Sequence, residues 1–260
     1  MMLPMTTTDS RDMETPLGWR DEWRRVDSRW GPMIVNRFDQ YIGWSFLAYG
    51  EFSPDEVKFL QSLVSPGDVV VDAGANLGAI AIPLAQKVGP TGRILCFEPQ
   101  PRVFELLALN RMQTELDCID ARMLAVGSAP GELVLPELDY GHPNNFGGVS
   151  LQREGAGIRI PVEPIDAFRL SSVRLLKIDV EGMEREVLEG ARDTIERCRP
   201  LLYVENDRPE KSEALIALIE ELDYGWQEHR PMLYSSTNHF KNPNDLFPTI
   251  ASWNLYCEPR

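Results

Sequence analysis

Short apolar runs alternate along this chain with segments in which apolar residues recur at helical spacing. The apolar runs predict seven strands, over residues 69–72, 93–97, 121–126, 173–179, 200–204, 224–229 and 252–257. Helical segments follow several of these runs, and a strand–helix–strand order implies a parallel sheet. Only a loop separates the last two runs, which favours an antiparallel last strand. The pattern therefore predicts an α/β fold, a doubly wound and mostly parallel seven-stranded sheet with an antiparallel last strand.

Three segments depart from this alternation. Residues 131–165 contain two short β-like runs around a long polar loop, which predicts a β-hairpin insertion with a functional loop. Residues 17–52 are rich in tryptophan and are expected to form a helical extension, either a lid over the active site or a segment that only packs onto the core. Residues 1–16 are polar and are expected to be a disordered tail, which leaves 53–260 as the main domain.

Composition and charge argue against several kinds of partner and location. The net charge is −14 without a basic patch, which disfavours nucleic acid and anionic membranes as partners. No apolar run is long enough to cross a bilayer, and the polar start does not resemble a secretory signal. The four cysteines are dispersed, as in a cytoplasmic protein with reduced thiols. A small molecule is therefore the expected partner, and a homodimer is left open.

A glycine-rich turn follows the first predicted strand, in the form D-A-G-A-N-L-G over 72–78. Gly74 allows the backbone to turn sharply near a ligand, and Gly78 allows the next helix to lie close to the strand. Asp72 stands where it would repel a pyrophosphate, whereas it suits the cationic sulfonium and ammonium groups of S-adenosylmethionine. The alternative is that Asp72 only caps the turn, which would fit any small-molecule α/β enzyme.

An acid also ends the second predicted strand. Glu98 is placed to accept hydrogen bonds from the ribose hydroxyls of an adenosine, which NAD and S-adenosylmethionine share. The absence of G-x-G-x-x-G and the position of Asp72 argue against an NAD-dependent oxidoreductase. A non-catalytic binding module is disfavoured because acids are present at the strand ends, including Asp179 and Glu181.

Further acids follow the fourth and fifth strands, at the edge of the sheet where ligands bind in α/β folds. Asp179, Glu205 and Asn206 could hold Mg²⁺ or Ca²⁺ through oxygen atoms. Without a metal, Asp179 and Glu181 are candidates for a general base. Lys177 is expected to be their salt-bridge partner.

The histidines show no metal-ligand spacing. His142 and His239 lie in predicted loops that could fold over the site. His142 is a further candidate for the general base. The alternative is that both histidines are ordinary loop residues.

Several motifs together resemble the FkbM-type S-adenosylmethionine-dependent methyltransferases: V-V-V-D-A-G-A-N-L-G (69–78), F-E-P (97–99), A-V-G (125–127), N-F-G-G-V-S (145–150), L-L-K-I-D-V-E-G-M-E (175–184) and Y-V-E-N (203–206). The resemblance covers about residues 30–257 and implies a Rossmann-like class I fold. It implies methyl transfer, most often to a hydroxyl of a sugar, polyketide or other secondary metabolite. An amine acceptor remains the rival within this class.

The resemblance also implies a cofactor site. Its expected members are Asp72, Gly74, Asn76, Gly78, Glu98 and Pro99, with Asp179 facing them. Gly50 and Glu51 are expected to close over the methionine end, and Ala125 and Val126 to lie beside the adenine.

Overall fold

The computed structural model describes residues 20–260, so Trp19 and the predicted tail over 1–16 lie outside the described residues. The strands are β1 Trp23–Ser28, β2 Gly31–Asn36, β3 Val69–Ala73, β4 Arg93–Phe97, β5 Ile119–Arg122, β6 Ala125–Val126, β7 Gly131–Leu135, β8 Ile158–Glu163, β9 Leu175–Ile178, β10 Leu201–Glu205, β11 Tyr224–His229 and β12 Asn254–Pro259. The helices are α1 Ile42–Tyr49, α2 Pro54–Leu63, α3 Ala81–Val88, α4 Pro101–Gln113, α5 Glu184–Glu189, α6 Arg192–Cys198 and α7 Pro209–Glu221, with a 3₁₀ turn at Ile165–Phe168.

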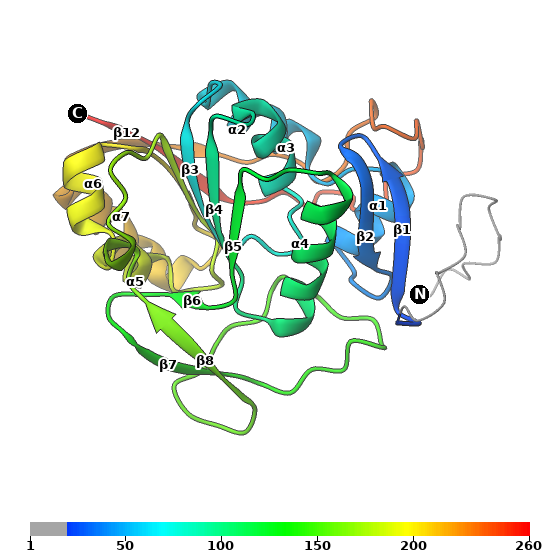
Figure 1. The fold of residues 1–260 in the computed structure, drawn as a ribbon, viewed down its shortest axis with the longest axis horizontal. Coiled ribbons are helices and arrows are strands. Elements are labelled where there is room, and N and C mark those ends of the chain that lie inside the picture. The colour runs from blue at the N-terminus through cyan, green and yellow to red at the C-terminus, as the bar shows by residue number, and fades with distance from the viewer. Residues whose placement is uncertain (1–19) are drawn as a thin grey trace.

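A seven-stranded sheet with the order β11-β12-β10-β9-β3-β4-β5 forms the centre of the molecule (Figure 1). The pairs from β10 to β5 are parallel, whereas β12 runs antiparallel to both β10 and β11. The predicted sheet is confirmed, including its antiparallel last strand.

Apolar residues on both faces of the central strands build two cores. Val70 and Ile94 belong to one buried cluster, and their neighbours Val71 and Leu95 belong to the other. This division follows from the two-residue period of a strand. The first core also contains residues of α2 and α3, and the second contains residues of α5, α6 and α7. Continuous β-branched runs such as 69–71 are needed because helices cover both faces.

The predicted third strand, 121–126, divides between two sheets. β5 belongs to the central sheet, whereas β6 pairs with β8 in a separate three-stranded sheet of order β6-β8-β7. The predicted hairpin insertion is confirmed, because β7 and β8 pair antiparallel. Figure 1 shows this small sheet at one end of the molecule, below β5 and α5.

Over its described residues, 20–52, the N-terminal extension is mainly a β-hairpin, and the predicted helix is present there only at α1. β1 and β2 pair antiparallel, and Gly31, with φ of +100°, follows the turn between them. Asn110 of α4 fixes the hairpin, because its side chain accepts a hydrogen bond from the Ile34 N–H (2.6 Å) and donates one to the Ile34 carbonyl (3.0 Å). The aromatic and β-branched residues of the hairpin form strands because this contact gives them a surface to pack against.

The segment 183–198, whose apolar residues recur at helical spacing and predict one helix after the fourth strand, forms two helices. α5 ends at Glu189 and α6 begins at Arg192. A Cβ on Gly190 would lie 2.0 Å from the carbonyl oxygen of Gly127, so the chain packs closely against the β6–β7 loop at this break. Across residues 20–260, no helix has the length and apolar character needed to cross a membrane.

Candidate active site

A cavity of about 440 Å³ lies at the carboxyl ends of β3, β4, β9 and β10. Its volume is within the range of small-molecule sites. Four further segments complete the wall: the α1 region, the insertion loop, residues 124–126 and the C-terminal loop before β12. The cavity therefore lies where the parallel topology and the predicted acids place it.

The loop after β3 depends on Gly74. Its φ is +83°, and a Cβ at this position would lie 1.7 Å from the carbonyl oxygen of Asp179. Only glycine therefore allows this loop to pass the end of β9 so closely. Gly74 and Asn76, which are both expected at the cofactor, line the cavity.

Glu98 is buried at the end of β4 and lines the same wall. Its carboxylate accepts hydrogen bonds from the backbone N–H groups of Asn76 and Gln100, each at 2.9 Å. Burial is the largest influence and raises the pKa of Glu98 to about 7. Two loops thus hold this carboxyl group in a fixed orientation at the cavity.

Asp72 does not line the cavity. Its side chain is fully buried, and Oδ1 lies 3.1 Å from Nζ of Lys177. Lys177 is itself buried and also lies 3.4 Å from Oδ2 of Asp179, which does line the cavity. The expected salt-bridge role of Lys177 is confirmed, while the expected direct role of Asp72 towards a cationic cofactor is replaced by charge compensation of Lys177.

Of the other residues predicted for the cofactor site, some line the cavity and some lie outside it. Pro99, Ala125 and Val126 line the cavity. Gly78 lies outside it: its φ is +93° and a Cβ there would be 3.0 Å from Leu107 Cδ1, so it serves the packing between α3 and α4.

Gly50 and Glu51 also lie outside the cavity wall, and Phe52 lies in it. Glu51 is buried and accepts hydrogen bonds from the Arg29 guanidinium (3.1 Å to Nη2) and from the His239 N–H (2.7 Å). Its carboxylate therefore joins the N-terminal extension to the C-terminal loop. Together, these segments form the side of the cavity opposite the sheet.

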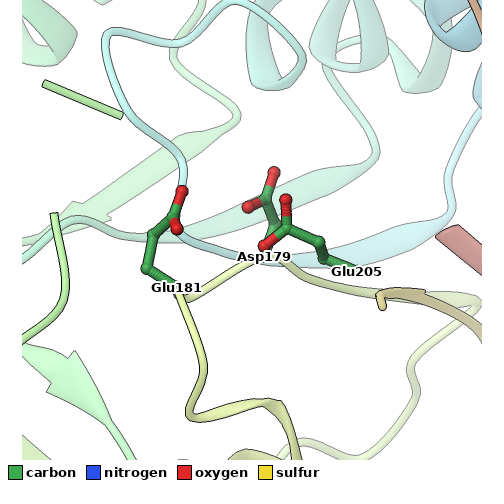
Figure 2. A group of neighbouring side chains, drawn as sticks. All are labelled: Asp179, Glu181 and Glu205. Atoms are coloured by element: carbon green, nitrogen blue, oxygen red, sulfur yellow. The ribbon is translucent and has the colours of Figure 1, made fainter. Parts of the chain in front are cut away.

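Three acids face one another at the ends of β9 and β10. Carboxylate oxygens of Asp179, Glu181 and Glu205 lie within 4.8 Å of one another, and Figure 2 shows the three groups directed to the same side of the chain. All three line the cavity. Arg208 donates a hydrogen bond to Oε2 of Glu181 at 2.9 Å. The cluster thus has two cationic neighbours, Lys177 on one side and Arg208 on the other.

Burial and mutual repulsion raise the pKa of two members of this cluster. Burial raises the pKa of Glu181 to about 8, with a further contribution from the charge of Asp179. Burial also raises the pKa of Glu205, and the neighbouring carboxylates of Asp179 and Glu181 raise it further. Like charges at such distances cannot all ionise at neutral pH.

Of the predicted metal set, Asp179 and Glu205 lie together, whereas Asn206 does not join them. Asn206 is absent from the cavity wall, and its side-chain amide donates a hydrogen bond to Oγ of Ser212 at 2.9 Å. The reason is strand alternation, which turns Asn206 away from the side that Glu205 faces. Since Lys177 and Arg208 already supply positive charge to the remaining acids, we derive no step through a metal ion.

The two loop histidines are also outside the cavity wall. The side chain of His142 is 80% exposed and pairs with Asp139, three residues before it, at 2.7 Å. The structure therefore does not bring His142 to the reacting groups. His239 contributes its backbone N–H to Glu51.

Several wall residues had no signal in the sequence. Arg208 follows β10 without a motif, and Trp253 precedes β12 as a single aromatic residue. The segment 145–149 has a detectable signal, because a polar glycine-rich loop within a compact domain is usually functional. Asn145, Gly147, Gly148 and Val149 of this loop line the cavity.

Comparisons with known proteins show similarity to methyltransferases. The model of the methyltransferase FkbM domain matches residues 72–225. The chain is 28% identical to "Methyltransferase sdnD" of Sordaria araneosa over 179 residues, which cover 55% of this chain and 67% of that protein. It is 26% identical to "2-O-methyltransferase NoeI" of Sinorhizobium fredii, over 64% of this chain and 74% of that protein. It spans 58% of the length of "Methyltransferase 1" of Beauveria bassiana, at 28% identity over 48% of this chain.

A solved structure shows the same fold at low identity. The FkbM methyltransferase of Methylobacillus flagellatus superposes with a TM-score of 0.51 and 19% identity, over 74% of this chain and 44% of that one. At this identity the likeness concerns the fold. The family model, in contrast, matches more than half of the chain and includes the first-strand glycine loop, Glu98 and the acids of β9 and β10. The chain therefore belongs to the methyltransferase FkbM domain family.

Proposed function

We propose that this protein is an S-adenosylmethionine-dependent methyltransferase that methylates a hydroxyl group of a small molecule. The observation that carries the proposal is the arrangement of two acidic groups around one cavity. Glu98 lies on the wall formed by the ends of β3 and β4, and Asp179, Glu181 and Glu205 lie on the wall formed by the ends of β9 and β10. The family and the name of the Sinorhizobium relative, a 2-O-methyltransferase, support the same reaction.

The residues of the first wall fit S-adenosylmethionine. Glu98 offers a fixed carboxyl group for ribose hydroxyls, and Ala125 and Val126 offer apolar surface for the adenine. Gly74 and Asn76 leave space beside them, and Asp179 brings negative charge towards the sulfonium end. When bound, the cofactor supplies an electrophilic methyl group on a positively charged sulfur.

The protein then has three tasks: to align the acceptor oxygen, to exclude water and to remove the hydroxyl proton. Residues of the extension and of the C-terminal loop form part of the cavity wall and would shield the reacting groups from water when both substrates are bound. Asp179, and Glu181 in its ionised form, lie on the wall and can take the proton at a carboxylate oxygen. Arg208 holds the carboxyl group of Glu181 in place through Oε2.

The charge of the wall also supports a small neutral acceptor. Phosphate-rich substrates would meet three acids that lie within 4.8 Å of one another. A molecule with a net charge of −14 repels them at longer range as well. The acceptor is therefore an uncharged or cationic small molecule in this proposal.

Calorimetric titration with S-adenosylmethionine, S-adenosylhomocysteine and NADH tests the cofactor. We expect binding of the first two only, and binding of NADH alone would overturn the proposal. Glu181→Gln tests the acid wall: turnover should fall by about 100-fold, the usual size of a general-base effect, while cofactor affinity stays near that of the wild type. Glu213→Gln, an exposed acid on α7, is the matched control. Treatment with a chelator should leave the wild-type rate unchanged.

A further inference from the structure

Gln100 follows Glu98 after the end of β4 and makes hydrogen bonds towards two different segments. Its backbone N–H donates to Oε1 of Glu98 at 2.9 Å. Its side-chain Nε2 donates to the Phe146 carbonyl at 2.7 Å, and its Oε1 accepts a hydrogen bond from the Tyr140 hydroxyl at 3.0 Å. The residue is 4% exposed and lines the cavity. Because both ends of this buried amide are bonded, it cannot turn without losing hydrogen bonds that are costly to leave unmade.

The position of Gln100 before α4 leaves its side chain available to bind another segment. It is the N-cap residue, where short polar side chains commonly bond the first helical N–H groups. Here the side chain makes no such bond, and the backbone carbonyl accepts hydrogen bonds from the N–H groups of Val103 (3.1 Å) and Phe104 (2.8 Å). The helix and Glu98 thus fix the main chain of Gln100, while its side chain binds residues 140 and 146 of the insertion loop between β7 and β8.

The part of the insertion loop that binds Gln100 is anchored on both sides. The rings of Tyr140 and Phe146 stack at a centroid distance of 4.7 Å, and Phe146 is buried. Between them, the N–H of Asn144 donates a hydrogen bond to the Phe38 carbonyl of the N-terminal extension at 3.0 Å. The loop residues that line the cavity, 145 and 147–149, lie on either side of Phe146. Their position therefore depends on how residues 140–146 are held.

Asn76 provides a second link between Glu98 and this loop. Its backbone N–H donates to Oε2 of Glu98 at 2.9 Å. Its side-chain Nδ2 lies beside Gly147, where a Cβ would be 3.4 Å from that nitrogen. Both residues that hold the Glu98 carboxylate through backbone N–H groups therefore also contact the loop through their side chains.

We infer that Gln100 is a positioning residue that couples the cofactor site at Glu98 to the insertion loop, and so to the acceptor side of the cavity. The inference rests on the proposed function for the ligand of Glu98 and goes beyond it. A ribose that binds the Glu98 carboxylate restrains Gln100 and Asn76 through the two N–H bonds, and these residues in turn restrain residues 145–149. The loop is thus held most firmly when the cofactor is bound, before an acceptor enters.

A purely structural role for Gln100 has different consequences. A buried amide that only filled space would affect the loop equally with and without the cofactor, and its loss would also loosen the neighbouring strands. The response of the loop to the cofactor product therefore separates the two roles, and it can be measured without the acceptor.

Hydrogen–deuterium exchange followed by mass spectrometry on the full chain tests the inference, with S-adenosylhomocysteine as the probe. Gln100→Met keeps the backbone N–H that holds Glu98 and removes both side-chain hydrogen bonds. Without ligand, the amides of residues 138–150 should exchange about tenfold faster in the variant than in the wild type, as for a loss of about 1.4 kcal/mol. At saturating S-adenosylhomocysteine, their exchange should slow by about fivefold or more in the wild type and by less than about twofold in the variant. Exchange in peptides from β3 and β9 should be the same in both proteins.

Gln61→Met is the matched control. Gln61 Nε2 donates to the Pro83 carbonyl at 2.8 Å, a bond of the same kind, and Gln61 and Pro83 lie outside the cavity wall. Exchange of the insertion loop in this variant should equal that of the wild type, with and without ligand. Tyr140→Phe removes only the bond to Oε1 of Gln100 and keeps the stacked ring, so the loop should exchange about two- to threefold faster. This second loop variant gives a result where Gln100→Met does not fold.

The inference is overturned if the loop exchanges at the wild-type rate in Gln100→Met, if the ligand slows the loop equally in both proteins, or if the faster exchange extends to the central strands. Calorimetry with S-adenosylhomocysteine separates these results from a failure of the proposed function. A wild type that does not bind this ligand contradicts the proposed function, whereas exchange in ligand-free Gln100→Met still reports whether Gln100 positions the loop.

Discussion

Lys177 is the buried cation on which the acidic wall depends, and Lys177→Met removes its charge while keeping its length. The Lys177 side chain is 3% exposed, and that of Asp72 is fully buried at 3.1 Å from it. Asp179 lies on the other side at 3.4 Å. In the variant, the carboxylate of Asp72 would stay buried without its compensating charge.

The expected cost follows from that geometry. Removing one partner of a buried ion pair destabilises a protein by about 3–5 kcal/mol. Typical domains have a free energy of unfolding of about 5–15 kcal/mol, so the variant should lose a large fraction of it. The double variant Asp72→Asn/Lys177→Met replaces both charges by uncharged groups. It should recover to within about 2 kcal/mol of the wild type.

The loss of unfolding free energy in Lys177→Met should also depend on pH. Burial raises the pKa of Asp72, and Lys177 acts in the opposite direction. Without Lys177, the pKa of Asp72 in the folded protein rises further above that in the unfolded chain. The folded variant therefore binds a proton more tightly than the unfolded chain does, and lower pH favours it. The difference from wild type should be largest near pH 8 and smaller near pH 5.

Urea unfolding followed by far-UV circular dichroism measures these quantities at both pH values. If Lys177→Met loses less than about 1 kcal/mol, the pair does not compensate Asp72 in the way that the distances indicate. The same conclusion follows if the double variant is as unstable as the single one. The double variant also gives a result where the single variant does not fold.

Two further predictions concern the fold around the cavity. Gly74→Ala places a Cβ 1.7 Å from the Asp179 carbonyl oxygen at a φ of +83°, so it should lower the free energy of unfolding by at least about 2–3 kcal/mol, measured by urea unfolding. Gly131→Ala is the control, because a Cβ there has nothing within 4 Å and should change the free energy of unfolding little. Burial raises the pKa of both Glu56 and Glu98 from 4.5 to about 7, so the folded state binds these protons more tightly. Their contribution to stability is complete below pH 4.5 and is lost as pH rises through 7, by up to about 1.4 kcal/mol per pH unit for each group. The urea midpoint of the wild type should therefore decrease from pH 5 to pH 7.5. The midpoint of Glu98→Gln should decrease less over the same range, and an equal decrease would contradict the assignment to Glu98.

The central sheet was predictable because its signals are local. A strand buried on both faces requires a continuous apolar run, and β3 has one in Val69–Val71. The acids that follow these strands are then placed by topology alone, since parallel strands end at one edge. For this reason Glu98, Asp179, Glu181 and Glu205 could be assigned to one cavity before their distances were known.

The predictions that differ from the structure mostly concern segments whose conformation depends on contacts between distant parts of the chain. The extension forms a hairpin because Asn110 of α4 binds Ile34, a partner 76 residues away. The family resemblance implied that Glu51 closes over the methionine end of the cofactor, whereas in the structure Arg29 and the His239 backbone bind its carboxylate. The orientation of Asn206, in contrast, follows from strand alternation and could have been predicted from Glu205.

The two halves of the cavity therefore differ in how closely the sequence specifies them. The half assigned to the cofactor is formed by turns directly after β3 and β4, where Gly74 and Glu98 act within short segments. The half assigned to the acceptor brings together Phe52, the insertion loop, Arg208 and Trp253 from segments that meet only in the folded protein. Variation in those segments can alter the acceptor without changing the strand ends assigned to the cofactor. Substitution of Trp253 should therefore change which acceptor is used, and substitution of Glu98 should weaken the use of every acceptor.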